Sequence, residues 1–120
     1  MAEPDTPTFD PHHLAEACGD DIDVQREIVV DFLSQLDERL EDIATAVASR
    51  GATTIQRTAH TLKGASASLG APALAGASAR LESLGRTGAL DGATEALQEV
   101  RDEAARLREA LADFPRDRAA

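Results

Sequence analysis

The feature that most constrains this chain is the spacing of its large apolar residues, which recur three or four positions apart in four successive segments. A helix of 3.6 residues per turn gathers residues with that spacing on one face, whereas a half-buried strand would need strict alternation. No segment of the sequence shows the alternation of a strand, so we predict an all-α protein. The longest run comprises Ile22, Val29, Phe32, Leu36, Leu40, Ile43 and Val47.

Glycine, proline and short polar residues indicate where the predicted helices begin and end. Asp10 and Pro11 suit the cap and the first position of a short helix that stops at Gly19. The chain then has room for four longer helices joined by short turns. They are expected over residues 22–49, over residues 53–69, from 72 to a turn at 86–88, and over residues 92–113.

Capping residues are predicted at three of these helix ends. Thr53, with Gln56 three residues later, resembles a capping box for the helix over 53–69. Asp91 is expected to cap the last helix. Arg50 suits the dipole at the end of the helix over 22–49, and Gly51 suits its stop.

Long amphipathic helices that are joined by short turns pack as antiparallel neighbours. We therefore expect an antiparallel up-down-up-down four-helix bundle over residues 9–114, with the short N-terminal helix laid across one end. Residues 1–8 contain two prolines and are expected to form a flexible arm, and residues 115–120 a polar tail. A monomer is expected; the alternative is a helical dimer in which the apolar stripes are shared between chains.

Length and composition limit the class of protein. A chain of 120 residues is long enough for one domain with one modest core. Its single cysteine, Cys18, allows no intrachain disulfide and fits a reducing compartment. Apolar runs stay well short of the roughly 20 residues of a membrane span, and the N-terminus lacks a signal pattern. We therefore expect a cytoplasmic protein that does not associate with membranes.

Charge is distributed unevenly along the chain. The net charge of −10 argues against nucleic acid as a partner. Residues 1–50 hold 13 acids and 3 bases, whereas residues 51–86 hold a single acid, Glu82, and four bases, so this segment carries +3. An anion or an acidic protein surface would be drawn to this segment. Its bases are Arg57, Lys63, Arg80 and Arg86.

His60 falls on the outer face of the predicted helix over 53–69. At 100° per residue it lies about 140° from the line of residues that would face the core. Lys63 stands one turn further along, and Gly64 and Ala67 bring almost no side chain to this face. A glycine inside a helix costs about 1 kcal/mol relative to alanine, so we expect another molecule to approach the backbone at Gly64. Helix packing is the alternative explanation. The expected core line comprises Ile55, Ala59, Leu62, Ser66 and Leu69.

The segment Ala59-His60-Thr61-Leu62-Lys63-Gly64 resembles the motif of histidine-containing phosphotransfer (Hpt) domains. The resemblance covers about residues 14–111, and its most specific part spans residues 59–82. It implies that Nε2 of His60 is the phosphorylated atom. The positions that continue the pattern are Ser66, Leu69-Gly70, Leu74 and Leu81-Glu82.

A neutral imidazole is a good nucleophile near pH 7, and phosphoryl transfer needs mainly positioning and charge neutralisation. Lys63 is the expected neutralising cation. Glu82 is the candidate for holding Nδ1 of His60; the alternative for Glu82 is an exposed charge that pairs with Arg86. Gln56, Arg57, Gly64 and Ala67 are expected to form the surface for a partner's close approach, and Arg80 and Arg86 are candidate partner contacts.

The resemblance implies a phosphorelay intermediate that takes a phosphoryl group from a receiver-domain aspartyl phosphate and passes it to another receiver. A hybrid histidine kinase is an expected partner. The chain would be a phosphocarrier and not an autokinase, because it shows no Gly-rich nucleotide loop. No metal site or cofactor is expected, and Mg²⁺ would come with the receiver. The main rival is a helical module that binds a receiver or kinase without carrying phosphate. A sensor-kinase histidine segment is less favoured, because Thr61 stands where such segments place an acid.

Overall fold

The computed structural model describes residues 6–114, which form five α-helices and one 3-10 turn and contain no strand. The prediction of an all-α protein is therefore confirmed. The elements in chain order are α1 (Pro11–Cys18), α2 (Ile22–Ala48), α3 (Ala52–Leu69), α4 (Pro72–Thr87), the 3-10 turn η1 (Leu90–Gly92) and α5 (Ala93–Leu111).

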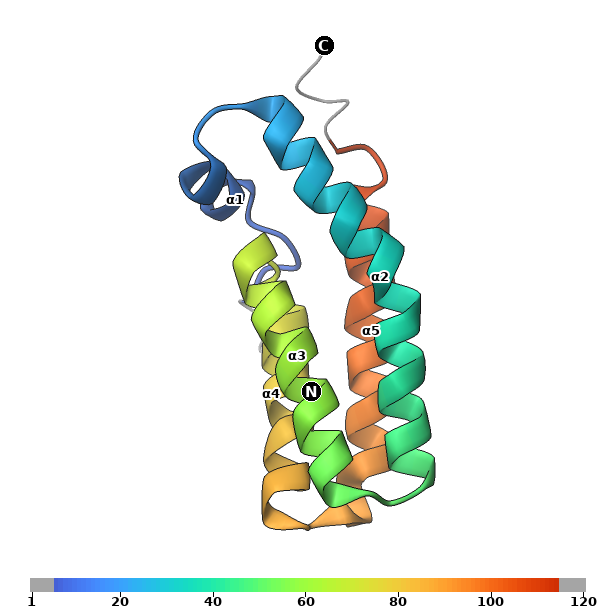
Figure 1. Cartoon of the computed structure of the whole chain (residues 1–120). Helices are drawn as coiled ribbons and strands as arrows, with labels where there is room; N and C mark the ends of the chain where they lie inside the picture. Colours follow the sequence, from blue (N-terminus) through green and yellow to red (C-terminus); the bar gives the residue numbers. More distant parts are fainter. Residues whose placement is uncertain (1–5, 115–120) are drawn as a thin grey trace.

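The four longer helices lie side by side along the length of the molecule, and α1 sits at one end (Figure 1). Each long helix contacts two others: α3 packs on α2 and α4, and α5 packs on α4 and α2. The α3–α4 pair has the most extensive contact, and a turn of only two residues, Gly70 and Ala71, joins its two helices. This close pair carries the basic segment of the sequence.

The core consists of the apolar stripes that the sequence pattern predicted. All five residues of the expected line on α3 are buried, and so are the large apolar residues of α5. On α2, Val29, Phe32, Leu36 and Ile43 are buried, whereas its remaining stripe residues are half-buried at the edges. These stripes are covered within one chain, so a core shared between two copies is not needed to bury them.

Of the three N-caps that the sequence predicted, the one at Asp10 is confirmed and those at Thr53 and Asp91 are wrong. The carboxylate of Asp10 accepts from the amide of His12 at 3.0 Å. Asp21, for which no cap was predicted, caps α2 by accepting from the amide of Asp23 at 3.0 Å. The capping box at Thr53 does not form, because α3 begins one residue earlier, after Gly51. Asp91 lies inside η1 and does not cap α5, whose N-cap is Gly92. In both cases the short connection determines where the helix begins.

The end of α2 also differs from the expectation. The helix stops at Ala48, and Ser49 rather than Gly51 occupies its C-cap position. Arg50 follows in the left-handed region with φ of 55°, so it belongs to the turn and not to the last turn of the helix. A non-glycine residue takes this conformation because only three residues separate α2 from α3.

The N-terminal segment is attached to the bundle where the structure describes it. The carbonyl of Pro7 accepts from the amide of Ala73 at 3.1 Å, and the ring of Phe9 meets that of Phe114 edge to face at 5.6 Å. The expected flexible arm therefore does not extend to Pro7. The rest of that expectation, at residues 1–5, and the expected polar tail at 115–120 lie outside the described residues. Within residues 6–114, no helix combines the length and the hydropathy that a membrane crossing would require.

Candidate functional site at His60

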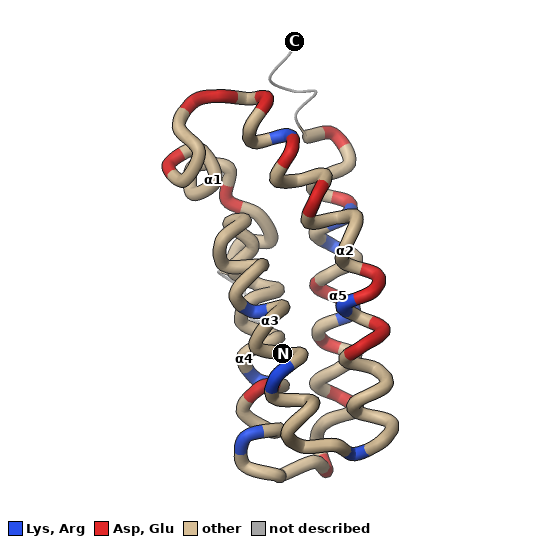
Figure 2. Tube along the Cα trace, in the orientation of Figure 1, with Lys and Arg blue, Asp and Glu red and all other residues tan. Residues whose placement is uncertain are grey.

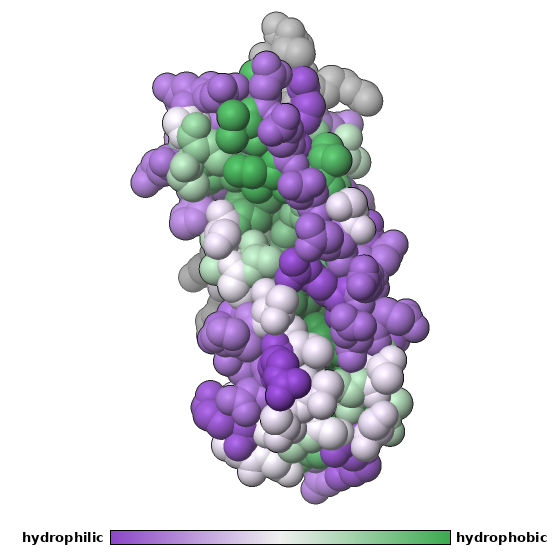
Figure 3. Space-filling view, in the orientation of Figure 1, coloured by the Kyte–Doolittle hydropathy of each residue, from purple (hydrophilic) through white to green (hydrophobic). Residues whose placement is uncertain are grey.

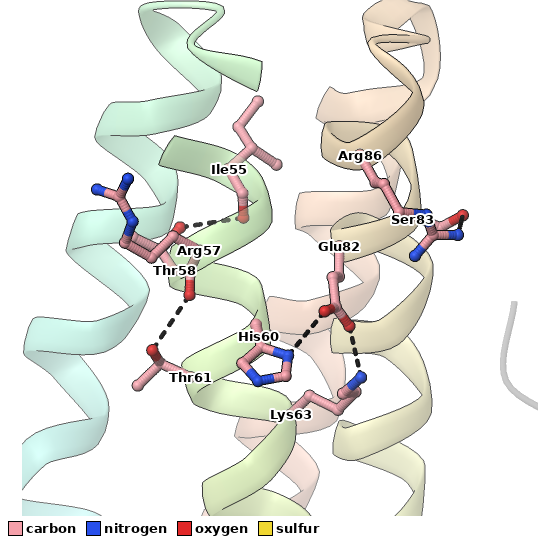
Figure 4. Close-up of polar contacts among 9 residues, drawn as sticks. All are labelled: Ile55, Arg57, Thr58, His60, Thr61, Lys63, Glu82, Ser83 and Arg86. Carbon is pink, nitrogen blue, oxygen red and sulfur yellow. Dashed lines mark hydrogen bonds and ion pairs between the residues drawn. The ribbon is translucent and has the colours of Figure 1, made fainter. Parts of the chain in front are cut away.

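Three side chains from α3 and α4 meet on the surface of the bundle (Figure 4). Nδ1 of His60 lies 2.7 Å from Oε2 of Glu82, and Nζ of Lys63 lies 2.6 Å from Oε1 of the same carboxylate. Glu82 comes from α4, 22 positions after His60. One carboxylate therefore holds both functional candidates of α3, one on each oxygen.

The three side chains differ in their exposure to solvent. The side chain of Glu82 is 11% exposed, whereas those of Lys63 and His60 are 36% and 65% exposed. The prediction that His60 projects outward is confirmed. The alternative that Glu82 is an exposed charge paired with Arg86 is wrong, because Glu82 is buried between His60 and Lys63 and Arg86 donates to Oγ of Ser83 at 3.2 Å.

The ionisation of Glu82 determines which imidazole nitrogen is free. The hydrogen bond from Lys63 lowers the pKa of the Glu82 carboxyl below its usual value of 4.5; burial acts in the opposite direction, and the bond from His60 adds to the lowering. An ionised carboxylate only accepts hydrogen bonds, so Nδ1 of His60 must carry the proton. In the neutral ring Nε2 then has a lone pair, which is the nucleophilic form of the imidazole.

The surface next to His60 is bare. Gly64 and Ala67 are exposed, and a Cβ atom built on Gly64 would meet nothing within 4 Å outside its own helical turn. The alternative that Gly64 serves helix packing is therefore wrong. An open cavity of about 370 Å³ lies on the other side of the imidazole. It is lined by Thr53, Gln56, Arg57, His60 and Glu82.

The four basic residues of the segment 51–86 have different surroundings. Figure 2 shows them on α3 and α4, while acidic residues follow α2, α5 and the loop before α2. Lys63 is engaged by Glu82, and Arg80 is paired with Glu99 of α5 at 2.7 Å. Arg57 extends away from the imidazole in Figure 4. Of the four cations, the structure brings Lys63 alone into the group formed by His60 and Glu82, within the part of the chain it describes.

Further apolar surface is exposed at the end of the molecule near α1. The exposed large apolar residues are Val24, Ile28 and Val30 of α2, with 37%, 36% and 58% of their surface accessible. In Figure 3 apolar side chains gather where α1 and the first half of α2 meet.

The described residues contain no group of three His, Cys, Asp or Glu side chains that could hold a metal ion.

Comparisons with known proteins converge on one family. The sequence model of the Hpt domain matches residues 27–110, which include all of α3 and α4 and therefore the whole group of His60, Lys63 and Glu82. The structure is similar to that of histidine-containing phosphotransfer protein B (HptB) from Pseudomonas aeruginosa PAO1, with a TM-score of 0.83 and 29% sequence identity. That similarity covers 89% of this chain and 93% of HptB. A search of curated proteins gives no match.

Proposed function

The chain belongs to the Hpt domain family, and on this premise we propose that it carries a phosphoryl group on Nε2 of His60 within a phosphorelay. The observation that supports this most directly is the geometry of the imidazole. Its Nδ1 is held by a buried carboxylate, and its other edge stands in solvent beside a surface cleared of side chains.

The chemistry can be written for an acyl phosphate donor, such as an aspartyl phosphate of a receiver domain. The lone pair of Nε2 attacks phosphorus, the bond from phosphorus to the aspartyl oxygen breaks, and the aspartate leaves as a carboxylate. The ring keeps its proton on Nδ1 and therefore gains a positive charge. Glu82 accepts from that proton at 2.7 Å, so it stabilises the charge that the ring acquires.

Lys63 and Gly64 have separate roles in this proposal. Lys63 lies one turn after His60, and its ammonium group has three N–H donors, of which Glu82 occupies one. A second donor is available for a phosphoryl oxygen. Gly64 leaves the space through which the partner's aspartate must approach Nε2 in line with the bond that breaks.

The expected partners follow from the same chemistry. The donor is a receiver domain, often one of a hybrid histidine kinase, and the acceptor is a second receiver; Mg²⁺ belongs to their acidic pockets. The chain acts as a cytoplasmic, monomeric phosphocarrier without autokinase activity. Its four long helices form an antiparallel up-down-up-down bundle, so that α3 and α4 present one continuous docking face with Gln56, Arg57 and Ala67 around His60.

The test is incubation with a receiver domain that carries a labelled aspartyl phosphate. The natural protein is expected to take up label that is stable in base and labile in acid, as a phosphoramidate is. His60→Gln is expected to take up none. His12→Gln, which removes another exposed histidine, serves as the matched control and should behave as the natural protein.

The rival hypothesis makes a different prediction in the same experiment. A helical module that binds a receiver without carrying phosphate would bind the receiver equally well with and without His60 and would never become labelled. Label on His60→Gln at the natural level, or no label on the natural protein despite binding, would contradict the proposed function.

A further inference from the structure

The backbones of α3 and α4 lie in close contact at Gly85. A Cβ atom built on Gly85 would lie 2.6 Å from the amide nitrogen of Gln56 and 2.8 Å from the carbonyl oxygen of Ala52. Both are backbone atoms of α3, so no side-chain rotation can relieve the overlap. The absence of a side chain at Gly85 is therefore what allows the two helices to come this close.

This contact lies one helical turn from the functional group. Gly85 follows Glu82 by three residues on α4, and Gln56 precedes His60 by four residues on α3. Residues three and four apart lie above one another on a helix. The turn of α3 that touches Gly85 is thus the neighbour of the turn that carries His60, and the same holds for Glu82 on α4.

The distances show how sensitive the site is to this spacing. Ordinary van der Waals contact with a Cβ begins at 3.4 Å, which exceeds the 2.6 Å found at Gly85 by 0.8 Å. A separation of about that size, carried one turn to Glu82 and directed along the bond, would lengthen the 2.7 Å bond to Nδ1 of His60 to about 3.5 Å, the outer limit of a hydrogen bond. The bond from Lys63, at 2.6 Å, is stretched in the same way.

We propose that Gly85 is a positioning residue for His60: it sets the distance between α3 and α4 that allows Glu82 to hold the imidazole and Lys63 together. Gly85 does not contact the imidazole directly, so it acts through the spacing of α3 and α4 and thereby through the bonds that Glu82 makes to His60 and Lys63. The consequence for phosphoryl transfer rests on the proposed function of His60, whereas the consequence for the imidazole does not.

The experiment compares Gly85→Ala with Gly76→Ala. Both substitutions replace an interior glycine of α4 by alanine, but a Cβ atom at Gly76 would meet only the guanidinium of Arg80, at 3.7 Å. The first readout is the ¹⁵N chemical shift of the two His60 nitrogens, which reports where the ring proton resides. The second is the rate of phosphoryl uptake from a labelled receiver.

We expect Gly76→Ala to match the natural protein in both readouts. Gly85→Ala should lose the preference for the proton on Nδ1 and take up phosphate about 10- to 100-fold more slowly, the range that a displacement near 1 Å produces. A Gly85→Ala protein that keeps the natural ¹⁵N shifts and the natural rate would overturn the proposal.

A second variant covers the case in which Gly85→Ala does not fold. Glu82→Asp withdraws the carboxylate by one methylene, about 1.5 Å, and leaves Gly85 and the helix spacing unchanged. The proposal requires Glu82→Asp to lose the Nδ1 preference and to slow uptake; natural behaviour would overturn it. If the natural protein takes up no phosphate at all, the proposed function fails, and the ¹⁵N comparison still tests the role of Gly85.

Discussion

Replacing Gly64 should stabilise the fold, and a long side chain at this position should also slow phosphoryl transfer. Gly64 lies inside α3 (Ala52–Leu69), it is exposed, and a Cβ atom there would meet nothing within 4 Å. Gly64→Ala therefore incurs no steric cost and recovers the helix propensity that glycine lacks, about 0.8–1.0 kcal/mol. The midpoint of urea unfolding should rise by about 0.3–1 M, given a slope of about 1–3 kcal/mol per molar.

Gly64→Gln separates stability from function. Glutamine is also a better helix former than glycine, so the free energy of unfolding should again rise. Its side chain, however, fills the open space at Gly64 through which, in the proposed function, a receiver approaches His60. We expect phosphoryl transfer from a labelled receiver to slow markedly in this variant, while Gly64→Ala keeps most of its rate. Ala105→Gln, an equivalent change at an exposed position of α5, is the control and should transfer at the natural rate.

Two results would refute this reasoning about Gly64. A loss of stability in Gly64→Ala would mean that the bare backbone serves the fold of the isolated chain. A natural transfer rate in Gly64→Gln would mean that no partner approaches this turn of α3 closely. The combination of higher stability and lower activity is the pattern expected where a residue is retained for function.

Other substitutions test the remaining parts of the structure. Leu62→Ala should lower the free energy of unfolding by about 2–5 kcal/mol in urea titrations, because Leu62 is completely buried. Lys63→Ala should slow phosphoryl transfer and leave the circular dichroism spectrum unchanged. Glu82→Gln should be less stable than the natural protein at pH 7; because the pKa of Glu82 is lowered in the fold, this difference is present above pH 4.5 and is lost as the pH falls through the lowered pKa. Unfolding at pH 7 and pH 3 measures it.

The faces of the helices could be predicted from the sequence because they depend on periodicity alone. Ile55, Ala59 and Leu62 share a line on any helix with 3.6 residues per turn, and the packing of α2 and α4 on α3 then buries that line. The exposure of His60 follows as a geometric consequence of the same period. This part of the candidate site needed no knowledge of the tertiary structure.

Details that depend on the turns between helices, or on how one helix packs against its neighbour, could not be predicted from the sequence. The capping box at Thr53 failed because the turn that contains Arg50 starts α3 at Ala52. The hydroxyl of Ser66, a residue on the expected core line of α3, is buried without a hydrogen bond to any residue that the structure describes.

Glu82 binds both His60 and Lys63, and the periodicity of the sequence was insufficient to predict this pair of contacts. Sequence reasoning placed Glu82 near Nδ1 of His60 but left its partner on the other oxygen unidentified, since that depends on how far α4 is shifted along α3. In the structure, Gly85 of α4 lies against Ala52 and Gln56 of α3. The sequence contained a signal, a glycine on the inner line of a helix rich in small residues, but such a signal does not say which turn of the neighbour it touches.

The sharing of Glu82 also balances charge through the proposed reaction. Before transfer, Lys63 and a neutral imidazole both donate to the buried carboxylate. After transfer the ring is positively charged, so its bond to Glu82 becomes charge-assisted and stronger. The carboxylate then depends less on Lys63, which is free to turn toward the new phosphoryl oxygens one turn away. A glutamine at position 82 could orient the neutral imidazole, but it could not compensate the positive charge that the ring acquires on phosphorylation. The carboxylate of Glu82 can do both, so it stabilises phosphorylated His60 as well as orienting the free ring.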